Sequence, residues 1–256
     1  MVFELQQISA SRGGVPALAG IELALEPGRI HGILGPNGSG KTTLLDLMCR
    51  LLPPDAGAVR LEGRPIASYS RRELARTVSL VPQDYGISFP FTVEETVLMG
   101  RHPHLGPFSS PMRRDREKAE AAMEATGTLA FAGRPVTALS GGERQRVAFA
   151  RMLAQDAPVM LLDEPTANLD VGHALDLMDL VAGLVESLGR TAVVVMQDLN
   201  LALRYCRSLV FLKQGRIRAQ GPVRDVLVPR VLGDVFEKDA LVRMEPELGV
   251  PQVLFR

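Results

Sequence analysis

The stretch GPNGSGKTT, residues 35–43, limits the possible folds of this chain more than any other part of the sequence. It has the spacing of a phosphate-binding loop, and it lies between an apolar run typical of a strand and the start of a predicted helix. Gly35, Gly38 and Gly40 allow the backbone to curl tightly, so that successive N–H groups point into one concavity. The positive end of the helix dipole adds to the attraction for an anion.

Two side chains of this loop have separate predicted tasks. Lys41 can reach the β- and γ-phosphates of a nucleotide, and the Thr42 hydroxyl can ligate Mg²⁺. Average residue usage gives a chance match to this pattern in about one chain in a hundred of this length. The strand and helix on either side make chance less probable still. The candidate nucleotide ligands are Gly35, Pro36, Asn37, Gly38, Ser39, Gly40, Lys41, Thr42 and Thr43.

Short apolar runs that alternate with helical segments predict an α/β fold with a parallel sheet covered on both faces. The runs that we interpret as strands are 29–35, 77–82, 159–163, 191–196 and 208–212, and a hairpin is predicted over 209–221. One predicted helix has Leu44, Leu47, Met48 and Leu51 on one face and stops at Pro53-Pro54; a second has Leu177, Val181, Leu184 and Leu188, and is closed by Gly189.

Residues 85–157 interrupt this alternation and predict a mostly helical inserted subdomain. We interpret the charged run 113–125 within it as a solvated helix face. The nucleotide-binding core is then expected to consist of residues 1–84 and 158–223, followed by a C-terminal segment, 224–256.

The stretch PVMLLDEP, residues 158–165, supplies two carboxylates at the end of a buried strand. Neighbouring residues on a strand point to opposite faces, so the two carboxylates are expected to have different tasks. Asp163 is placed to hold Mg²⁺ through water, and Glu164 to polarise the attacking water.

The stretch LSGGERQR, residues 139–146, predicts a second phosphate site. Ser140 and Glu143 have the spacing of a capping box, so a helix is expected to begin here. Gly141 and Gly142 are more than a helix start needs, and they indicate that something approaches the backbone closely. Two copies arranged head to tail about a two-fold axis would use both phosphate sites for each nucleotide.

With these motifs in this order, the chain resembles an ATP-binding cassette ATPase of the ABC transporter superfamily. In the terms of that family, Walker A is 35–43, Walker B is 159–164 and the signature is 139–143. The Q-loop is Gln83, and the D-loop, 167–170, ends at Asp170. The resemblance implies a P-loop core that binds ATP and Mg²⁺, an N-terminal antiparallel β subdomain, and a helical subdomain that carries the signature. It also implies that Ser140, Gly141, Gly142 and Asp170 contact nucleotide, and that Gln83 contacts the metal.

The stretches 89–108 and 168–180 are similar to ATPase subunits of importers for iron–siderophore complexes, haem and cobalamin. The resemblance implies a homodimer, a membrane permease that Gln83 links to the γ-phosphate site, and an extracytoplasmic substrate-binding protein. It places the chain at the cytoplasmic face of the membrane, held there by the permease.

The composition of the chain argues against several classes of protein. Lys and Arg number 29, as do Asp and Glu, which argues against a nucleic-acid binder. No basic and apolar leader and no membrane-length apolar run is present, so the chain is expected to be soluble by itself. Cys49 and Cys206 lack metal-ligand spacing and are interpreted as reduced thiols.

Two positions depart from the family pattern. Near the N-terminus, where the family usually has an aromatic residue that stacks on adenine, this chain has Arg12, which either stacks through its guanidinium or is solvated. After the predicted strand 191–196, where the family has its switch histidine, this chain has Gln197.

Three functions are therefore weighed. The first is an ATPase that drives an importer, with Glu164, Gln197 and Gln83 as its catalytic residues. The second is an ATP-switched, dimerising subunit with weak turnover, supported by Gln197 and opposed by Glu164. The third, an ABC protein outside transport, is opposed by the short stretch between Gln83 and Leu139 and by the absence of net positive charge.

Overall fold

The computed structural model describes residues 1–83, 86, 89–106, 109–246 and 249–256. The chain divides into two compact units, which we name unit 1 (Met1–Ser68 with Val185–Arg256) and unit 2 (Tyr69–Leu184). The predicted domain boundary between residues 84 and 85 lies outside the described residues. Helix α6, Val171–Leu188, crosses from unit 2 into unit 1.

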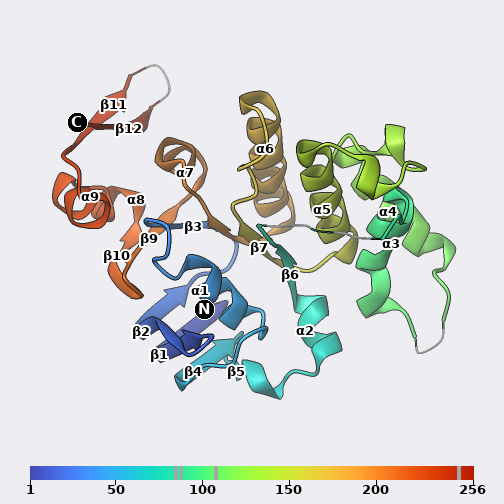
Figure 1. The fold of residues 1–256 in the computed structure, drawn as a ribbon, viewed down its shortest axis with the longest axis horizontal. Coiled ribbons are helices and arrows are strands. Elements are labelled where there is room, and N and C mark those ends of the chain that lie inside the picture. Colours follow the sequence, from blue (N-terminus) through green and yellow to red (C-terminus); the bar gives the residue numbers. More distant parts are fainter. Residues whose placement is uncertain (84–85, 87–88, 107–108, 247–248) are drawn as a thin grey trace. The chain divides into compact units, whose positions relative to one another are not determined.

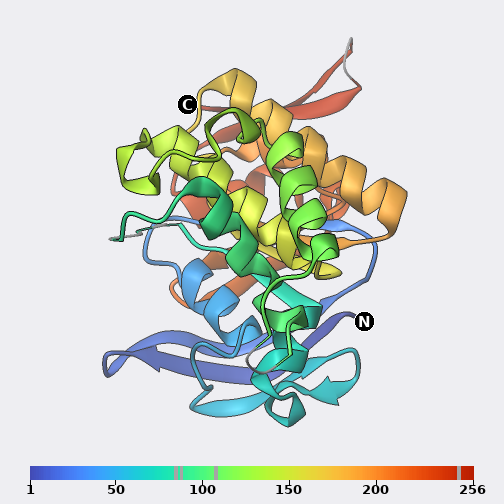
Figure 2. The same ribbon diagram turned by 90° about the vertical axis from the view of Figure 1, so that its right-hand side faces the viewer.

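The described residues of unit 1 contribute strands to three sheets, and the smallest of these is the antiparallel pair β11 and β12. The first is antiparallel, in the order β2-β1-β4-β5, and α1 lies against it (Figures 1 and 2). In the second, β3 pairs in parallel with β8 and β9, while β10 pairs with β9 in antiparallel fashion. The elements of the first sheet and its helices are β1 (Phe3–Arg12), β2 (Val15–Leu25), α1 (Lys41–Met48), β4 (Ala56–Leu61), β5 (Arg64–Pro65) and the 3₁₀ turn Ile66–Ser68. The remaining elements are β3 (Ile30–Leu34), β8 (Thr191–Val195), α7 (Leu199–Tyr205), β9 (Ser208–Lys213), β10 (Arg216–Pro222), α8 (Val223–Val226), α9 (Pro229–Phe236), β11 (Ala240–Glu245) and β12 (Val250–Phe255).

Unit 2 is mostly helical. Strands β6 and β7 pair in parallel, and helices α3, α4 and α5 pack against one another (Figure 2). These helices share an apolar core that includes Val97, Met123 and Val147. Its elements are α2 (Arg71–Thr77), β6 (Val78–Val81), α3 (Val93–Leu98), α4 (Arg113–Ala125), α5 (Gly141–Gln155) and β7 (Val159–Asp163). The described residues of unit 2 also form the 3₁₀ segments Met99–His104, Leu129–Phe131 and Val136–Ala138.

The predicted α/β class is confirmed, together with the predicted strands and the hairpin of β9 and β10. Every residue of β3, β7 and β8 is buried, which explains why their sequences are apolar runs without alternation. Cys49 and Cys206 are free thiols, as predicted, and burial raises the pKa of each to about 12. No helix in the described part of the chain has the length and apolar character that crossing a membrane requires.

Two predicted helix faces need correction. Helix α1 ends at Met48 and does not continue to Pro53, because Arg50 adopts a left-handed conformation (φ 56°) and reverses the chain. Leu51 therefore lies outside the helix and is 65% exposed. In α6, Leu177 and Val181 are buried as predicted, but Leu188 is exposed and Val185 takes its place on the buried face.

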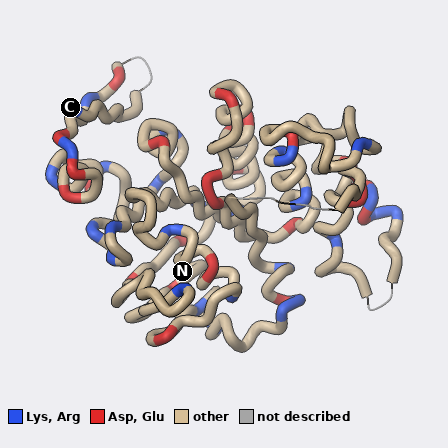
Figure 3. The backbone as a smooth tube through the Cα atoms, in the orientation of Figure 1, with Lys and Arg blue, Asp and Glu red and all other residues tan. Residues whose placement is uncertain are grey.

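The charged run 113–125 forms α4, and it is more than a solvated face. Figure 3 shows both basic and acidic residues in this part of the tube, yet Asp115 is only 1% exposed on this helix. Its carboxylate accepts from Arg101 Nε at 3.1 Å and from the Met112 backbone N–H at 3.0 Å. Arg101 also donates to the Ala154 carbonyl at 2.8 Å, so this ion pair ties α4 to α5.

Burial by itself raises the pKa of Asp115, but the Met112 N–H and Arg101 outweigh it and hold the pKa below its ordinary value. We expect Asp115→Ala to lower the free energy of unfolding by about 3 kcal/mol, because it leaves Arg101 buried without its counter-charge. The matched control is Glu117→Ala on the same helix, whose pair with Arg113 is exposed and is worth less than about 1 kcal/mol.

Denaturant unfolding of the three proteins checks this. Because the folded pKa is depressed, the contribution of Asp115 is present above the unfolded pKa of about 4 and is lost as the pH falls through the folded pKa. The difference in the free energy of unfolding between the parent and Asp115→Ala should therefore become smaller at acidic pH. Equal stability of the two variants at neutral pH would contradict the assignment.

Candidate nucleotide-binding site

The phosphate loop of unit 1 has the shape that its glycines predict. Gly38 and Gly40 adopt positive φ angles of 75° and 104°. A Cβ atom at Gly35 would lie 2.0 Å from the Leu212 carbonyl oxygen, and one at Gly40 would lie 2.8 Å from the Ala17 carbonyl oxygen. Gly35 is therefore required by close packing, Gly38 by its backbone angle, and Gly40 by both.

The loop presents donors that fit a phosphate group. Lys41 is buried, and its Nζ donates to the carbonyl oxygens of Gly35 (2.9 Å) and Pro36 (3.1 Å). Gly40 is the N-cap residue of α1, which has no side-chain cap and no acidic residue in its first turn. The buried Ser39 Oγ has no hydrogen-bond partner among the described atoms. An unsatisfied hydroxyl, an uncapped helix start and a buried ammonium group together fit an anionic ligand.

Arg12 lies at the end of β1, where its guanidinium forms an ion pair with the carboxylate of Asp46 in α1. The side chain remains 56% exposed. Asp46 was not among the predicted site residues, although an acidic residue on the polar side of the helix after the loop is a usable signal. The pair keeps Arg12 beside the phosphate-loop helix.

Gln197 lies two residues beyond the end of β8, after Met196. The N–H of Met196, one residue earlier, donates to the Ile33 carbonyl of β3 at 3.1 Å, so the chain leaves β8 beside the strand that leads into the phosphate loop. Gln197 is exposed there. Asp198 then caps α7 by accepting from the Leu201 N–H at 3.0 Å.

The two carboxylates of unit 2 lie at the end of β7, as predicted. The predicted reason for their different directions, strand alternation, is wrong. Strand β7 ends at Asp163, and Glu164 already lies beyond it with a left-handed backbone, φ 48°. The two side chains are thus separated by a change of backbone direction and not by strand alternation. Both are buried, and the exposed Gln83 donates from Nε2 to Glu164 Oε2 at 3.0 Å.

The signature stretch forms the predicted capping box. Ser140 Oγ accepts from the Glu143 N–H at 3.3 Å, and Glu143 Oε2 accepts from the Ser140 N–H at 2.7 Å. The hydrogen bond from this Ser140 N–H lowers the pKa of Glu143 below its ordinary value. A Cβ on Gly142 would lie 3.2 Å from the Asn168 carbonyl oxygen, whereas one on Gly141 would meet nothing within 4 Å. Gly142 thus packs against the D-loop, and Gly141 is open.

Asp170 ends the D-loop and caps α6, because its Oδ1 accepts from the His173 N–H at 2.9 Å. His173 Nδ1 lies 2.7 Å from Asp170 Oδ2. His31 is buried on β3 between the Ser208 hydroxyl and the Glu26 carbonyl, and burial lowers its pKa. His104 contacts the Gln155 carbonyl at 2.8 Å. Each of these three histidines therefore has a local structural partner.

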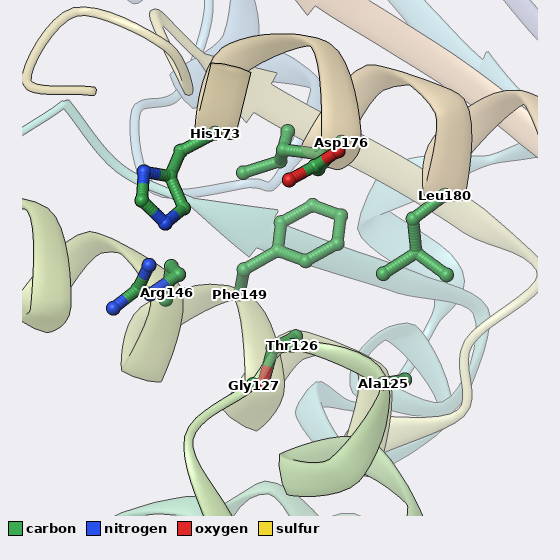
Figure 4. A pocket seen from close by; sticks show the side chains of 9 residues that line it. Ala125, Thr126, Gly127, Arg146, Phe149, His173, Asp176 and Leu180 are labelled. Atoms are coloured by element: carbon green, nitrogen blue, oxygen red, sulfur yellow. The ribbon is translucent and has the colours of Figure 1, made fainter. Parts of the chain in front are cut away.

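A pocket of about 420 Å³ lies in unit 2 between the end of α4 and helices α5 and α6 (Figure 4). Arg146 and His173 lie at one end, and Phe149, Leu177 and Leu180 form its apolar part. None of the predicted site residues lines it. The predicted chemistry is instead divided between the two units: the phosphate loop, Arg12 and Gln197 in unit 1, and Gln83, Asp163, Glu164, the signature and Asp170 in unit 2.

Comparison with known proteins agrees with these motifs. The family model described as ABC transporter matches residues 18–167. The hemin import ATP-binding protein HmuV of Pseudomonas entomophila is 42% identical over 260 residues, covering 100% of both chains. The cobalamin import ATP-binding protein BtuD of Halobacterium salinarum is 41% identical over 99% of this chain, which spans 63% of that protein's length.

Among solved structures, a metal-chelate type ABC transporter in an inward-facing conformation superposes with a TM-score of 0.85 at 25% identity, covering 100% of this chain and 97% of that one. The family match spans more than half of the chain and includes the phosphate loop, the signature and the paired carboxylates. On this evidence, the chain belongs to the ABC transporter family of ATP-binding cassettes.

Proposed function

We propose that this chain is the ATP-hydrolysing subunit of an importer for a metal chelate, such as an iron–siderophore complex or haem, or for cobalamin. The observation that carries the ATPase assignment is the phosphate loop, with buried Lys41, the orphaned Ser39 hydroxyl and the uncapped start of α1. The cargo class is supported by relatives named for hemin and cobalamin import at 42% and 41% identity.

The predicted site residues named below have proposed roles in this reaction. The loop N–H groups and Lys41 hold the β- and γ-phosphates, and Arg12 faces the base. Thr42, Asp163 and Gln83 would hold Mg²⁺, which would neutralise charge on the phosphates. Glu164 polarises the attacking water, and its hydrogen bond with Gln83 supports a link between the water-activating carboxylate and the Q-loop.

We also propose that two copies assemble head to tail with ATP between them. Gly141 supports this, because its surroundings are open and the start of α5 is available to a ligand held by a second copy. A permease on the membrane side, fed by an extracytoplasmic substrate-binding protein, completes the proposed importer. A nucleotide-switched subunit with weak turnover is the second candidate, and Gln197 at the position of the family's histidine is the observation that favours it.

ATP with Mg²⁺ should promote the dimer and ADP should not, because only the γ-phosphate reaches the partner's Ser140, Gly141 and Gly142. In Glu164→Gln the dimer should persist, since hydrolysis stalls while binding is retained. Light scattering measures the mass. The same mass with ATP and with ADP in this variant would contradict the head-to-tail assembly.

The residue at position 197 could act in hydrolysis either as a positioned hydrogen-bond donor or as a proton shuttle, and glutamine can perform only the first of these roles. Its amide donates hydrogen bonds but does not titrate, whereas imidazole does both. As a donor, Gln197 should support slow but measurable hydrolysis. Gln197→His should then raise kcat modestly, and Gln197→Ala should lower it by up to about 100-fold.

Steady-state phosphate release from the three forms, with permease present, tests this assignment. Binding of Mg-ATP serves as the control and should be equal in all of them. If Gln197→Ala hydrolyses ATP at the parent rate, the proposed role of Gln197 as a hydrogen-bond donor is contradicted.

The permease is expected to dock near Gln83 and residues 83–108, of which 84–85, 87–88 and 107–108 lie outside the described residues. Phe89 and Phe91 are 68% and 40% exposed, with ring centroids 6.1 Å apart. Replacing both by Ser should weaken association with the permease while leaving Mg-ATP binding unchanged, because an exposed aromatic pair is a typical interface anchor.

Copurification with permease in detergent measures this, and Met112→Ser, at another exposed apolar residue of unit 2, is the matched control. Crosslinks from the permease that fall only on residues 224–256 would place the interface elsewhere.

A further inference from the structure

The C-terminal segment, defined here as Val223–Phe255, has no role in the function proposed above. Within unit 1 it forms α8, α9 and the β11–β12 hairpin (Figure 1). Three sets of contacts join it to elements that carry the nucleotide site, and all of them lie within unit 1.

The first contact is at the end of β9. Lys213 Nζ donates to the Asp234 carbonyl of α9 at 2.5 Å and pairs with the Glu237 carboxylate at 2.9 Å. The preceding residue, Leu212, places its carbonyl against Gly35, and Gly215 donates its N–H to the Ser39 carbonyl at 3.0 Å. The α9 end of the segment is thus fixed to the strand that supports the phosphate loop.

The second contact is a row of three aromatic rings. Phe211 of β9 meets Phe236 of α9 edge to face at 6.3 Å, and Phe236 meets Phe255 of β12 at 5.5 Å. Such pairs contribute beyond their buried area because the ring edges and faces carry opposite partial charge. The row extends the anchor on β9 to the last strand of the chain.

The third contact reaches the helix after Gln197. Asn200 Oδ1 accepts from the Val253 N–H at 2.8 Å, and Asn200 Nδ2 donates to the Val253 carbonyl at 3.4 Å. The side-chain amide therefore pairs with β12 as a neighbouring strand would. Val253 itself is 4% exposed against α7, whose cap, Asp198, is the residue next to Gln197.

We propose that the C-terminal segment is a clamp that fixes α7 relative to β9, and that Asn200 is a positioning residue for Gln197. Packing of α7 alone needs only apolar contact from Leu199 and Leu203, which are both buried. The two hydrogen bonds to one residue of β12 add a fixed register at the first turn of α7. This role rests on the proposed function, because it assigns Gln197 to the reaction.

The test compares Asn200→Ala with Arg243→Ala. Asn200→Ala removes both hydrogen bonds to Val253, whereas Arg243 is exposed on the same hairpin and its replacement leaves those bonds intact. Asn200→Asp, which keeps only the acceptor, should be intermediate. Amide hydrogen exchange over residues 199–203 should be about fivefold faster in Asn200→Ala and unchanged in Arg243→Ala.

Phosphate release supplies the second measurement. In Asn200→Ala kcat should fall about fivefold with KM unchanged, because positioning and not binding is lost. In a Gln197→Ala background the same change should have no further effect on kcat, since Asn200 acts through Gln197. If the effects of Asn200→Ala and Gln197→Ala on kcat are fully additive in the double variant, the positioning role of Asn200 is overturned.

Exchange also separates failure of the clamp from failure of the proposed function. Unchanged exchange over residues 199–203 in Asn200→Ala overturns the clamp whatever the enzyme does. Faster exchange with unaltered kcat, in a parent whose activity depends on Gln197, overturns the role of Asn200. If kcat of Gln197→Ala itself equals that of the parent, the proposed role of Gln197 fails, and the positioning role of Asn200 fails with it. The exchange measurement still decides, in that case, whether the C-terminal segment holds α7.

Discussion

The close approach of Gly35 to the Leu212 carbonyl is the constraint on which unit 1 depends. Any side chain at residue 35 would place its Cβ 2.0 Å from that oxygen, so either the loop or β9 would have to move. Moving β9 would displace Gly215, whose N–H holds the Ser39 carbonyl, and Lys213, which holds α9. The phosphate loop and the C-terminal segment therefore both depend on residues 212–215, at and just beyond the end of β9.

Unit 2 has a corresponding constraint at Glu164. A left-handed backbone costs a residue with a side chain about 1–2 kcal/mol, and Glu164 is also buried. The strand β7 delivers Asp163 in a regular conformation, and the turn then gives Glu164 a different direction and the Gln83 amide as a partner. Strain of this kind is typical of functional sites, where direction matters more than stability.

Much of this arrangement could be predicted from the sequence because its signals are local. The buried strands, the β9–β10 hairpin, the phosphate-loop curl and the capping box at Ser140 each depend on residues within a few positions of one another. What could not be predicted depends on residues far apart. Arg101 finds Asp115 and the Ala154 carbonyl only in the folded unit, so a run of charges concealed a buried ion pair. The early end of α1 depends on a left-handed Arg50, which no turn residue marks.

The sequence motifs of this chain report on the nucleotide and say little about what an importer would carry. Phosphate chemistry fixes the loop glycines, Lys41 and the carboxylates, and it is the same whatever is transported. Relatives named for hemin and for cobalamin are accordingly 42% and 41% identical to this chain, so identity does not separate them. Under the proposed importer function, residues that distinguish cargo classes would lie on surfaces that the nucleotide does not use. Among the described residues, the exposed Phe89 and Phe91 fulfil that condition, because neither belongs to the nucleotide motifs and their side chains are not needed to fill a core.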